Sequence, residues 1–387
     1  MKPTNKILSS YGVTVFETMS QLAIKHQAIN LGQGFPDQNG PEELRLIAAD
    51  AVINGPNQYP PMLGISDLRQ AVAGHSKRFY ELELDWKTEV MITSGATEAL
   101  ASCMLGLIEP GDEVVLLEPL YDCYLPMVRR AGGVPKFVQL TPPNWDFSID
   151  SLTNAFSNKT KLILLNNPHN PTGKVFNKVE LEVIADLVKK YDAYVICDEV
   201  YEHLVFNNKK HIPLITLPFM RDRCIKIGSA GKTFSMTAWK VGYVSAAAPL
   251  LRAISKAHQF ITFTTPTCLQ KAVALGLQKN ATYFQALANN QQKKRDLLKE
   301  RLTAIGFEVL ATEGTYFLNV DIRSVGFKNG DVDFCEHIIK SAGVAAIPIS
   351  AFYQGTSLDH LVRFCFAKRD QILEQGAEQL GKYLMRR

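Results

Sequence analysis

Short apolar runs alternate with amphipathic segments through the first two thirds of the chain. Residues 89–93, 113–117, 161–165, 193–197 and 224–227 are mostly apolar or β-branched, with a single charged residue in four of the runs, and turn residues bound each run. Strands with side chains buried on both faces of a sheet have this pattern, whereas half-exposed strands alternate apolar and polar residues. The five runs therefore predict the strands of a mostly parallel sheet.

Helical patterns separate these strands. Residues 178–191 carry apolar side chains at i, i+3 and i+4, and residues 97–108 and 124–131 are also predicted to be helical. Strands that alternate with helices predict an α/β architecture, with helices on both faces of the sheet and ligands at the carboxyl ends of its strands.

Beyond about residue 253 the pattern changes to an α+β one. A long helical stretch at 283–304 leads to strand-like runs at 316–320 and 361–366 and to a last helix near 371–384. Because 387 residues exceed one compact core, we expect two domains. The large domain would span residues 33–280, and the small one would combine residues 1–32 and 281–387.

The composition excludes several classes of function. Charged residues make up 21% and the net charge is +4, which suits a globular enzyme and gives no reason to expect nucleic acid or a membrane surface as partner. No apolar run approaches a membrane span, and Met1–Leu8 lacks the apolar core of a signal peptide, so we expect a cytoplasmic protein. The seven cysteines form no C-x-x-C pair and the eight histidines no H-E-x-x-H, so we expect reduced, buried thiols and no metal.

Polar residues follow four of the predicted strands. Ser94–Thr97, Asn166–Gly173, Asp198–Tyr201 and Gly228–Thr233 each come directly after an apolar run. Any one of these segments alone is a common helix cap or turn. Their occurrence together, in order and at strand ends, predicts a cofactor pocket at the carboxyl edge of the sheet.

Lys232 is the candidate nucleophile of that pocket. Gly231–Lys232–Thr233 after a strand looks like a P-loop, but a P-loop needs a glycine where this chain has Lys226. The better interpretation is an aldehyde cofactor held by Lys232 as a Schiff base, because a pocket lysine of depressed pKa is the usual nucleophile for such chemistry.

Pyridoxal phosphate is such a cofactor, and the other strand ends offer partners for each part of it. Asp198 can keep its pyridine nitrogen protonated, Asn170 and Tyr201 can donate hydrogen bonds to its ring oxygen, and Tyr121 can stack on its ring. A helix N-terminus with its free amides, joined by a hydroxyl and a cation, can hold the phosphate; the residues concerned are Ala96, Thr97, Ser229 and Lys240.

These residues resemble those of the class I/II aminotransferases, which have PLP fold type I. The motifs are Asn167–Gly173, Asp198–Tyr201, Ser229–Lys232 and Trp239–Tyr243, and the resemblance runs from about Ile29 to Ala367. It implies a large domain with a mostly parallel, seven-stranded sheet between helices, and a smaller α+β domain built from both chain ends.

Within the family the chain looks most like the methionine aminotransferases and the kynurenine/glutamine transaminases. The segments Leu31–Asp37, Glu118–Tyr124 and Asp198–His203 carry this likeness. It implies transfer of an amino group from an amino acid to a 2-oxo acid by a ping-pong mechanism. A kynurenine aminotransferase or a β-lyase acting on cysteine conjugates stays an alternative on the same scaffold.

The resemblance also implies roles for single residues. Lys232, Asp198 and Tyr201 would be catalytic, with Asn170, Tyr121 and the phosphate-binding residues around the cofactor. Lys240 stands where the family often has arginine, so the charge is kept but a bidentate grip is lost. Tyr59 would reach the cofactor phosphate of the partner subunit, which implies a homodimer with shared active sites.

The remaining implied roles concern the substrate. Arg363 would clamp its carboxylate, assisted by the Gly34 amide, and Tyr11, Phe16 and Phe263 would line an apolar side-chain pocket. We find no second arginine for an acidic side chain, which favours methionine, aromatic or glutamine-like donors. A non-catalytic regulator of this fold is the remote alternative, because some thirty residues before Leu31 do not accommodate a helix-turn-helix domain.

Overall fold

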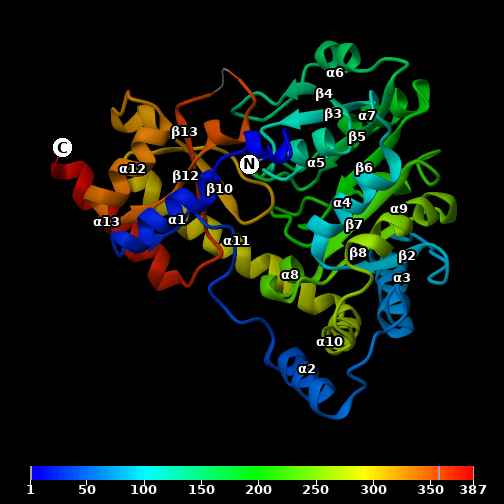
Figure 1. The fold of residues 1–387 in the computed structure, drawn as a ribbon. Helices are drawn as coiled ribbons and strands as arrows, with labels where there is room; N and C mark the ends of the chain where they lie inside the picture. The colour runs from blue at the N-terminus through cyan, green and yellow to red at the C-terminus, as the bar shows by residue number, and fades with distance from the viewer. Residues whose placement is uncertain (1, 356–357, 387) are drawn as a thin grey trace.

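A seven-stranded sheet in the order β2-β8-β7-β6-β5-β3-β4 dominates the computed structural model, which describes residues 2–355 and 358–386 (Figure 1). Strand β8 runs antiparallel to both of its neighbours, and the other neighbouring strands pair in parallel. The predicted mostly parallel α/β fold is thus confirmed. The strands are β2 (Val90–Thr93), β3 (Glu113–Glu118), β4 (Val134–Gln139), β5 (Thr160–Asn166), β6 (Tyr194–Asp198), β7 (Cys224–Ser229) and β8 (Gly242–Ala246).

Helices cover both faces of this sheet, which explains the consecutive apolar positions in its strands. In β5, Leu162 belongs to the hydrophobic cluster that includes α4 (Gly95–Leu107) and α9 (Ala248–Ile261). The next residue, Ile163, belongs to the cluster on the other face, with α7 (Lys178–Lys190). Because successive side chains of a strand point to opposite faces, both positions must be apolar.

Strands β4 and β8 were not predicted, and each departs from the buried-strand pattern. Strand β4 is an edge strand that contains Pro135 and is half exposed, so it lacks a continuous apolar run. Strand β8 is fully buried, but Gly242 and Ser245 interrupt its apolar run.

A second, smaller region combines both ends of the chain (Figure 1). Its four-stranded antiparallel sheet has the order β12-β13-β10-β9, and the N-terminal strand β1 pairs in parallel with β11. The predicted domain boundaries stay a prediction. The strands are β1 (Ile29–Asn30), β9 (Glu308–Val309), β10 (Phe317–Asp321), β11 (Val344–Ala345), β12 (Ile347–Pro348) and β13 (Leu361–Cys365).

The long helix α11 runs from the side of the large sheet to the smaller region (Figure 1). No helix in residues 2–355 and 358–386 is long and apolar enough to span a bilayer. All seven cysteines are free, but Cys123 and Cys268 are half-buried rather than buried. The remaining helices are α1 (Val15–Lys25), α2 (Glu42–Asn54), α3 (Ser66–Tyr80), α5 (Tyr124–Arg130), α6 (Ile149–Ala155), α8 (Ala230–Thr233), α10 (Thr267–Leu277), α11 (Ala281–Ala304), α12 (Asp331–Ala342) and α13 (Asp370–Arg386).

Candidate active site

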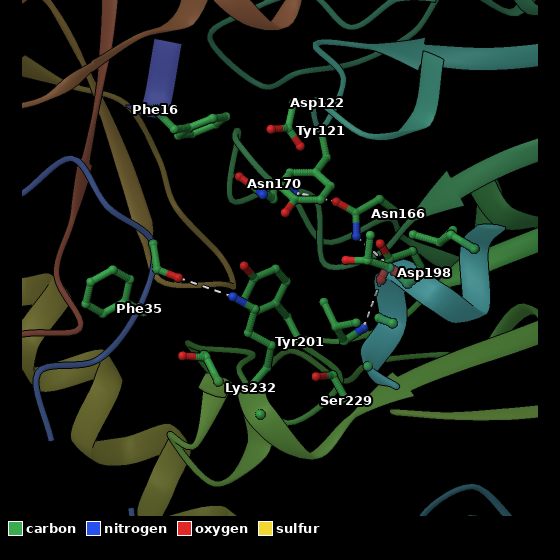
Figure 2. Close-up of a pocket in the computed structure, with 18 of the residues that line it drawn as sticks. Phe16, Phe35, Tyr121, Asp122, Asn166, Asn170, Asp198, Tyr201, Ser229 and Lys232 are labelled. Carbon is green, nitrogen blue, oxygen red and sulfur yellow. Dashed lines mark hydrogen bonds between the residues drawn. The ribbon is translucent and has the colours of Figure 1, made fainter. Parts of the chain in front are cut away.

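One pocket at the carboxyl edge of the large sheet gathers most of the predicted site residues (Figure 2). The ends of β2, β5, β6 and β7 reach it, and β13 of the smaller sheet supplies Arg363. The predicted residues that line it are Phe16, Gly34, Ala96, Thr97, Tyr121, Asn170, Asp198, Tyr201, Ser229, Lys232, Lys240 and Arg363.

Lys232 lies in the short helix α8, directly after β7. Its Nζ donates a hydrogen bond of 3.2 Å to the carbonyl oxygen of Gly34, and its own carbonyl accepts one of 2.6 Å from the hydroxyl of Tyr316. Burial lowers the pKa of Lys232 to about 8, because the charged ammonium is poorly solvated there. Near neutral pH the lysine therefore has an accessible free-amine form, as a nucleophile or a base needs.

Gly34 approaches the pocket so closely that a side chain would not fit. A Cβ added there would lie 2.5 Å from the ring of Phe317. The predicted role for Gly34 was donation from its amide, whereas the hydrogen bond present uses its carbonyl.

Asp198 ends strand β6 and is buried. Its Oδ2 accepts a 2.6 Å hydrogen bond from the hydroxyl of Tyr124, and its Oδ1 accepts one of 3.4 Å from the backbone N–H of Val200. Burial raises the pKa of Asp198, and the Tyr124 hydrogen bond and the positive charge of Lys232 oppose this rise. The carboxylate is thus held in one orientation by two donors.

Arg363 is a buried guanidinium that faces no carboxylate within hydrogen-bond distance in the described part of the chain. Its Nη1 donates to Asn170 Oδ1 at 2.8 Å and its Nη2 to the Gly32 carbonyl at 3.0 Å, while its Nε has no partner. Burial lowers the pKa of Arg363 to about 10. A buried charge without a counter-ion is costly, so this position favours the binding of an anion.

A second anion site forms where helix α4 begins. Gly95 has a φ of +78°, and the backbone amides that follow, including those of Ala96 and Thr97, lie in the first turn, where N–H groups have no partner within the helix. The ammonium of Lys240 lies 3.4 Å from where a Cβ on Gly95 would be. Across the described residues, the side chains of Thr97, Ser229 and Lys240 make no hydrogen bond to protein, so they are available to a phosphate.

Three predicted site residues do not line the pocket of this chain. Tyr59 is 84% exposed and contacts Phe263 edge to face, with ring centroids 5.7 Å apart. The hydroxyl of Tyr11 accepts a 3.0 Å hydrogen bond from Arg129. Of the three residues proposed for an apolar wall, Phe16 alone is among those that line the pocket.

Sequence reasoning missed several residues that do line it. Asp122 and Tyr124 follow β3. The predicted site rests on the polar residues that follow four other strands, and the same pattern after β3 could have predicted these two. Phe317 had no signal, since aromatic side chains are ordinary core residues in a sequence, whereas Phe35 lies in the segment Leu31–Asp37 that carries the family likeness.

A buried ionic network lies beside the turn that follows β6. The Nε2 atoms of His75 and His203 are 2.8 Å apart, and with Glu202 they form a group whose ligand atoms all lie within 4.8 Å of one another. However, Lys226 Nζ donates to Glu202 at 2.6 Å and the Tyr243 hydroxyl donates to its other oxygen at 3.0 Å. We interpret the group as a structural ion-pair network, because both carboxylate oxygens already have partners.

Comparison with known proteins identifies the family. A family model described as aminotransferase class I and II matches residues 26–380. The chain belongs to this family. The solved structure of N-succinyldiaminopimelate aminotransferase from Mycobacterium tuberculosis superposes with a TM-score of 0.96 at 42% identity and covers 98% of this chain and 100% of its own. The predicted fold type is confirmed.

Two curated relatives belong to the groups of aminotransferases that the motifs of this chain resemble. Methionine aminotransferase from Escherichia coli strain K12 is 40% identical over 373 residues, which is 96% of each chain. Kynurenine–oxoglutarate transaminase from Dictyostelium discoideum is 38% identical over 419 aligned positions, with 98% of this chain and 96% of the relative covered. The aminotransferase assignment is thus confirmed, while the named substrates of the relatives differ from one another.

Proposed function

We propose that this aminotransferase uses pyridoxal 5′-phosphate and takes the amino group from a neutral amino acid, namely methionine, an aromatic or a glutamine-like one, for transfer to a 2-oxo acid. The observation that carries the proposal is the gathering of Lys232, Asp198 and Arg363 in one pocket. Lys232 would supply a nucleophilic amine for the aldehyde of the cofactor, and Asp198 a buried carboxylate for its ring nitrogen. Arg363 would supply a buried, unneutralised guanidinium for the carboxylate of the donor.

The pocket fits the cofactor because each charged part of it meets a complementary group. Thr97, Ser229 and Lys240, with the N-terminus of α4, would hold the phosphate. Asp198 would pair with the protonated ring nitrogen, and the Asn170 amide nitrogen would donate to the ring oxygen, since its Oδ1 already accepts from the substrate-binding arginine. When bound, the cofactor supplies an aldehyde that condenses with amines and a ring that withdraws electrons from the reacting carbon.

The residues of the chain would perform the remaining steps. Lys232, with a pKa of about 8, would remove the α-proton of the donor as a free amine and return it at a second carbon. Tyr121 would cover the cofactor ring, and Tyr201 would donate to its oxygen. Arg363 would bind the carboxylate of the donor, which fixes the α-carbon beside Lys232.

The charges around the pocket support a neutral donor. In the described part of the chain, the cations that line it are Lys232, Lys240 and Arg363, and the first two would serve the cofactor. Phe16 lies beside the substrate anchor, with its ring centroid 5.3 Å from the guanidinium carbon of Arg363. A second carboxylate would lack a partner there, a penalty of several kcal/mol that corresponds to selectivity of about a hundredfold or more.

Two further donors have specific support. Kynurenine is supported by the 38% identity to a kynurenine transaminase, and cleavage of cysteine conjugates stays an alternative on the same scaffold. N-succinyldiaminopimelate is supported by the 42% identity to the M. tuberculosis enzyme named for it. The latter donor carries additional carboxylates, so its use would require a cation from outside this pocket.

We also propose that the active enzyme is a homodimer with shared sites. Tyr59 and Phe263 form an exposed aromatic pair, 84% and 39% accessible, that has no role in the pocket of its own chain. In a dimer this pair would complete the pocket of the partner subunit. Sedimentation velocity with simultaneous activity detection tests this, and a fully active monomer would contradict it.

A half-reaction screen tests the donor class. Single-turnover rates are measured from the change in cofactor absorbance with methionine, phenylalanine, glutamine, kynurenine and aspartate. We expect each neutral donor to react faster than aspartate. If aspartate reacts fastest, a basic residue that does not line this pocket serves the substrate and the neutral-donor proposal is wrong.

A further inference from the structure

Asp122 is a carboxylate on the wall of the pocket without a side-chain partner. It follows Tyr121 in the turn between β3 and α5, and its side chain is exposed to solvent through the pocket. In residues 2–355 and 358–386, no lysine, arginine or histidine forms an ion pair with it, so its negative charge is available to a ligand.

This carboxylate lies on the side of the pocket away from Ser229, one of the residues proposed to hold the phosphate. Figure 2 shows Asp122 and Phe16 at the top of the view, whereas Ser229 and Lys232 lie at the bottom. Asp122 also acts electrostatically on Arg363, the proposed anchor of the donor carboxylate. The side chain of a donor held by Arg363 therefore enters the region that Asp122 borders.

Asp122 and Asp198, the two aspartates of the pocket, differ in how much of their hydrogen-bond acceptor capacity is free for a ligand. Asp198 is buried, and the Tyr124 hydroxyl donates to it at 2.6 Å. Asp122 keeps its acceptor capacity open, since a carboxylate can accept about four hydrogen bonds and no side chain in the described part of the chain donates one to it.

We propose that Asp122 is a specificity-determining residue that contacts the end of the donor side chain. It accepts a hydrogen bond from an amide, amine or hydroxyl and repels a carboxylate. The inference deepens the proposed function and rests on it, because it takes the donor carboxylate to lie on Arg363. Like charges brought together in a binding site reduce affinity, although solvent at this exposed position screens part of the effect.

Glutamine and glutamate test the proposal, because they have the same shape and differ at the end of the side chain alone. The quantity measured is the ratio of their single-turnover rate constants, glutamine over glutamate, in the cofactor-loaded enzyme. In Asp122→Asn we expect this ratio to fall about fivefold, since the repulsion of glutamate is lost. Asp122→Ser, which also removes the charge, should lower the ratio similarly and provides a second variant.

Glu17→Gln is the matched control. Glu17 is an exposed acid next to Phe16 in α1, and it does not line the pocket. Its variant removes one negative charge nearby without changing the wall, so the glutamine-to-glutamate ratio should stay at the wild-type value.

Three outcomes would overturn the inference or its basis, and they are distinguishable. An unchanged ratio in both Asp122 variants refutes the role of Asp122. An equal change in Glu17→Gln refutes direct contact, because the effect would then come from net charge. If the wild-type enzyme reacts with no neutral donor at all, the proposed function itself is wrong. This outcome is seen in the wild-type enzyme alone, so it does not depend on the ratio measured in the variants.

Discussion

Two sets of buried charges lie on either side of the turn after β6, and they differ in how completely they are paired. Asp198 faces the pocket with Lys232 and Arg363. The next residue, Glu199, faces away from it and lies in the ionic network with Lys226, at 3.6 Å. One peptide bond thus separates the candidate catalytic machinery from a structural assembly.

Each charged group of the network has a partner of opposite charge, although Nδ1 of His211 has no hydrogen-bond partner. Glu199 also lies 3.0 Å from His211 Nε2, and Lys226 lies 2.6 Å from Glu202. Burial alone would lower the pKa of Lys226, but the carboxylates of Glu202 and Glu199 raise it above its ordinary value. The positive charge of Lys226 in turn holds the pKa of Glu202 below its ordinary value, so this pair stays ionised and holds the turn in place.

The pocket, in contrast, is left incomplete. Burial lowers the pKa of both Lys232 and Arg363, and Arg363 Nε has no partner. Unpaired charge is costly in the free protein, and a ligand with complementary charge recovers that free energy on binding. The comparison teaches that pairing, rather than burial, distinguishes a binding site from a scaffold in this molecule.

The strongest way to test this contrast is to remove the candidate nucleophile of the pocket. Lys232→Ala should lower transamination below detection, a loss on the order of 10⁵-fold or more, as for other enzymes without their nucleophile. The folded state disfavours the charge of Lys232 below pH 8, so the variant should unfold at the same temperature as wild type or higher at pH 7. Steady-state assays and thermal unfolding measure the two quantities. Wild-type turnover in this variant would exclude Lys232 as the nucleophile.

Asp198→Asn should have the next largest effect. The substitution keeps the shape and the strand end but removes the negative charge that would keep the cofactor nitrogen protonated. We expect kcat to fall about 10³-fold, with much smaller loss of cofactor binding. Cofactor titration by absorbance and half-reaction kinetics give both values, and near-normal kcat would remove Asp198 from the mechanism.

Lys226→Met tests the other side of the comparison. It leaves Glu199 and Glu202 buried without their cation, so the free energy of unfolding should fall by about 3–5 kcal/mol. Urea denaturation of the two proteins measures this difference. Lys178→Met is the control, because its ion pair with Glu182 is exposed and should contribute less than about 1 kcal/mol. Equal stability of both variants would show that the network contributes little.

Tyr124→Phe should have the smallest effect, and it tests the role of the hydrogen bond from the Tyr124 hydroxyl to Asp198. Loss of the hydroxyl removes a donor that holds the pKa of Asp198 down, so that pKa rises further. Activity that depends on ionised Asp198 is lost as pH falls through its pKa, so the acid limb of the kcat profile should move to higher pH. At neutral pH we expect a loss of about tenfold. Superimposable pH profiles would contradict the coupling.

Local patterns in the sequence predicted the fold class and most of the pocket. The runs that became β2, β3, β5, β6 and β7 are mostly apolar, because helices cover both faces of the sheet, and Lys226 in β7 is the buried exception. Polar residues at their ends mark the carboxyl edge, where parallel strands converge. Both signals lie within a few residues of one another along the chain, so they can be read without knowing the topology.

The sequence by itself predicted most of the polar residues that line the pocket, and the tertiary structure decided which of them meet. Arg363 reaches Asn170 from 193 positions away, and Tyr124 reaches Asp198 from 74. Tyr11 was predicted beside Phe16, yet its hydroxyl bonds Arg129 outside the pocket. Contacts of this kind depend on strand order and on how the smaller sheet packs against the larger one. The periodicity of side chains along the chain gives no information about either.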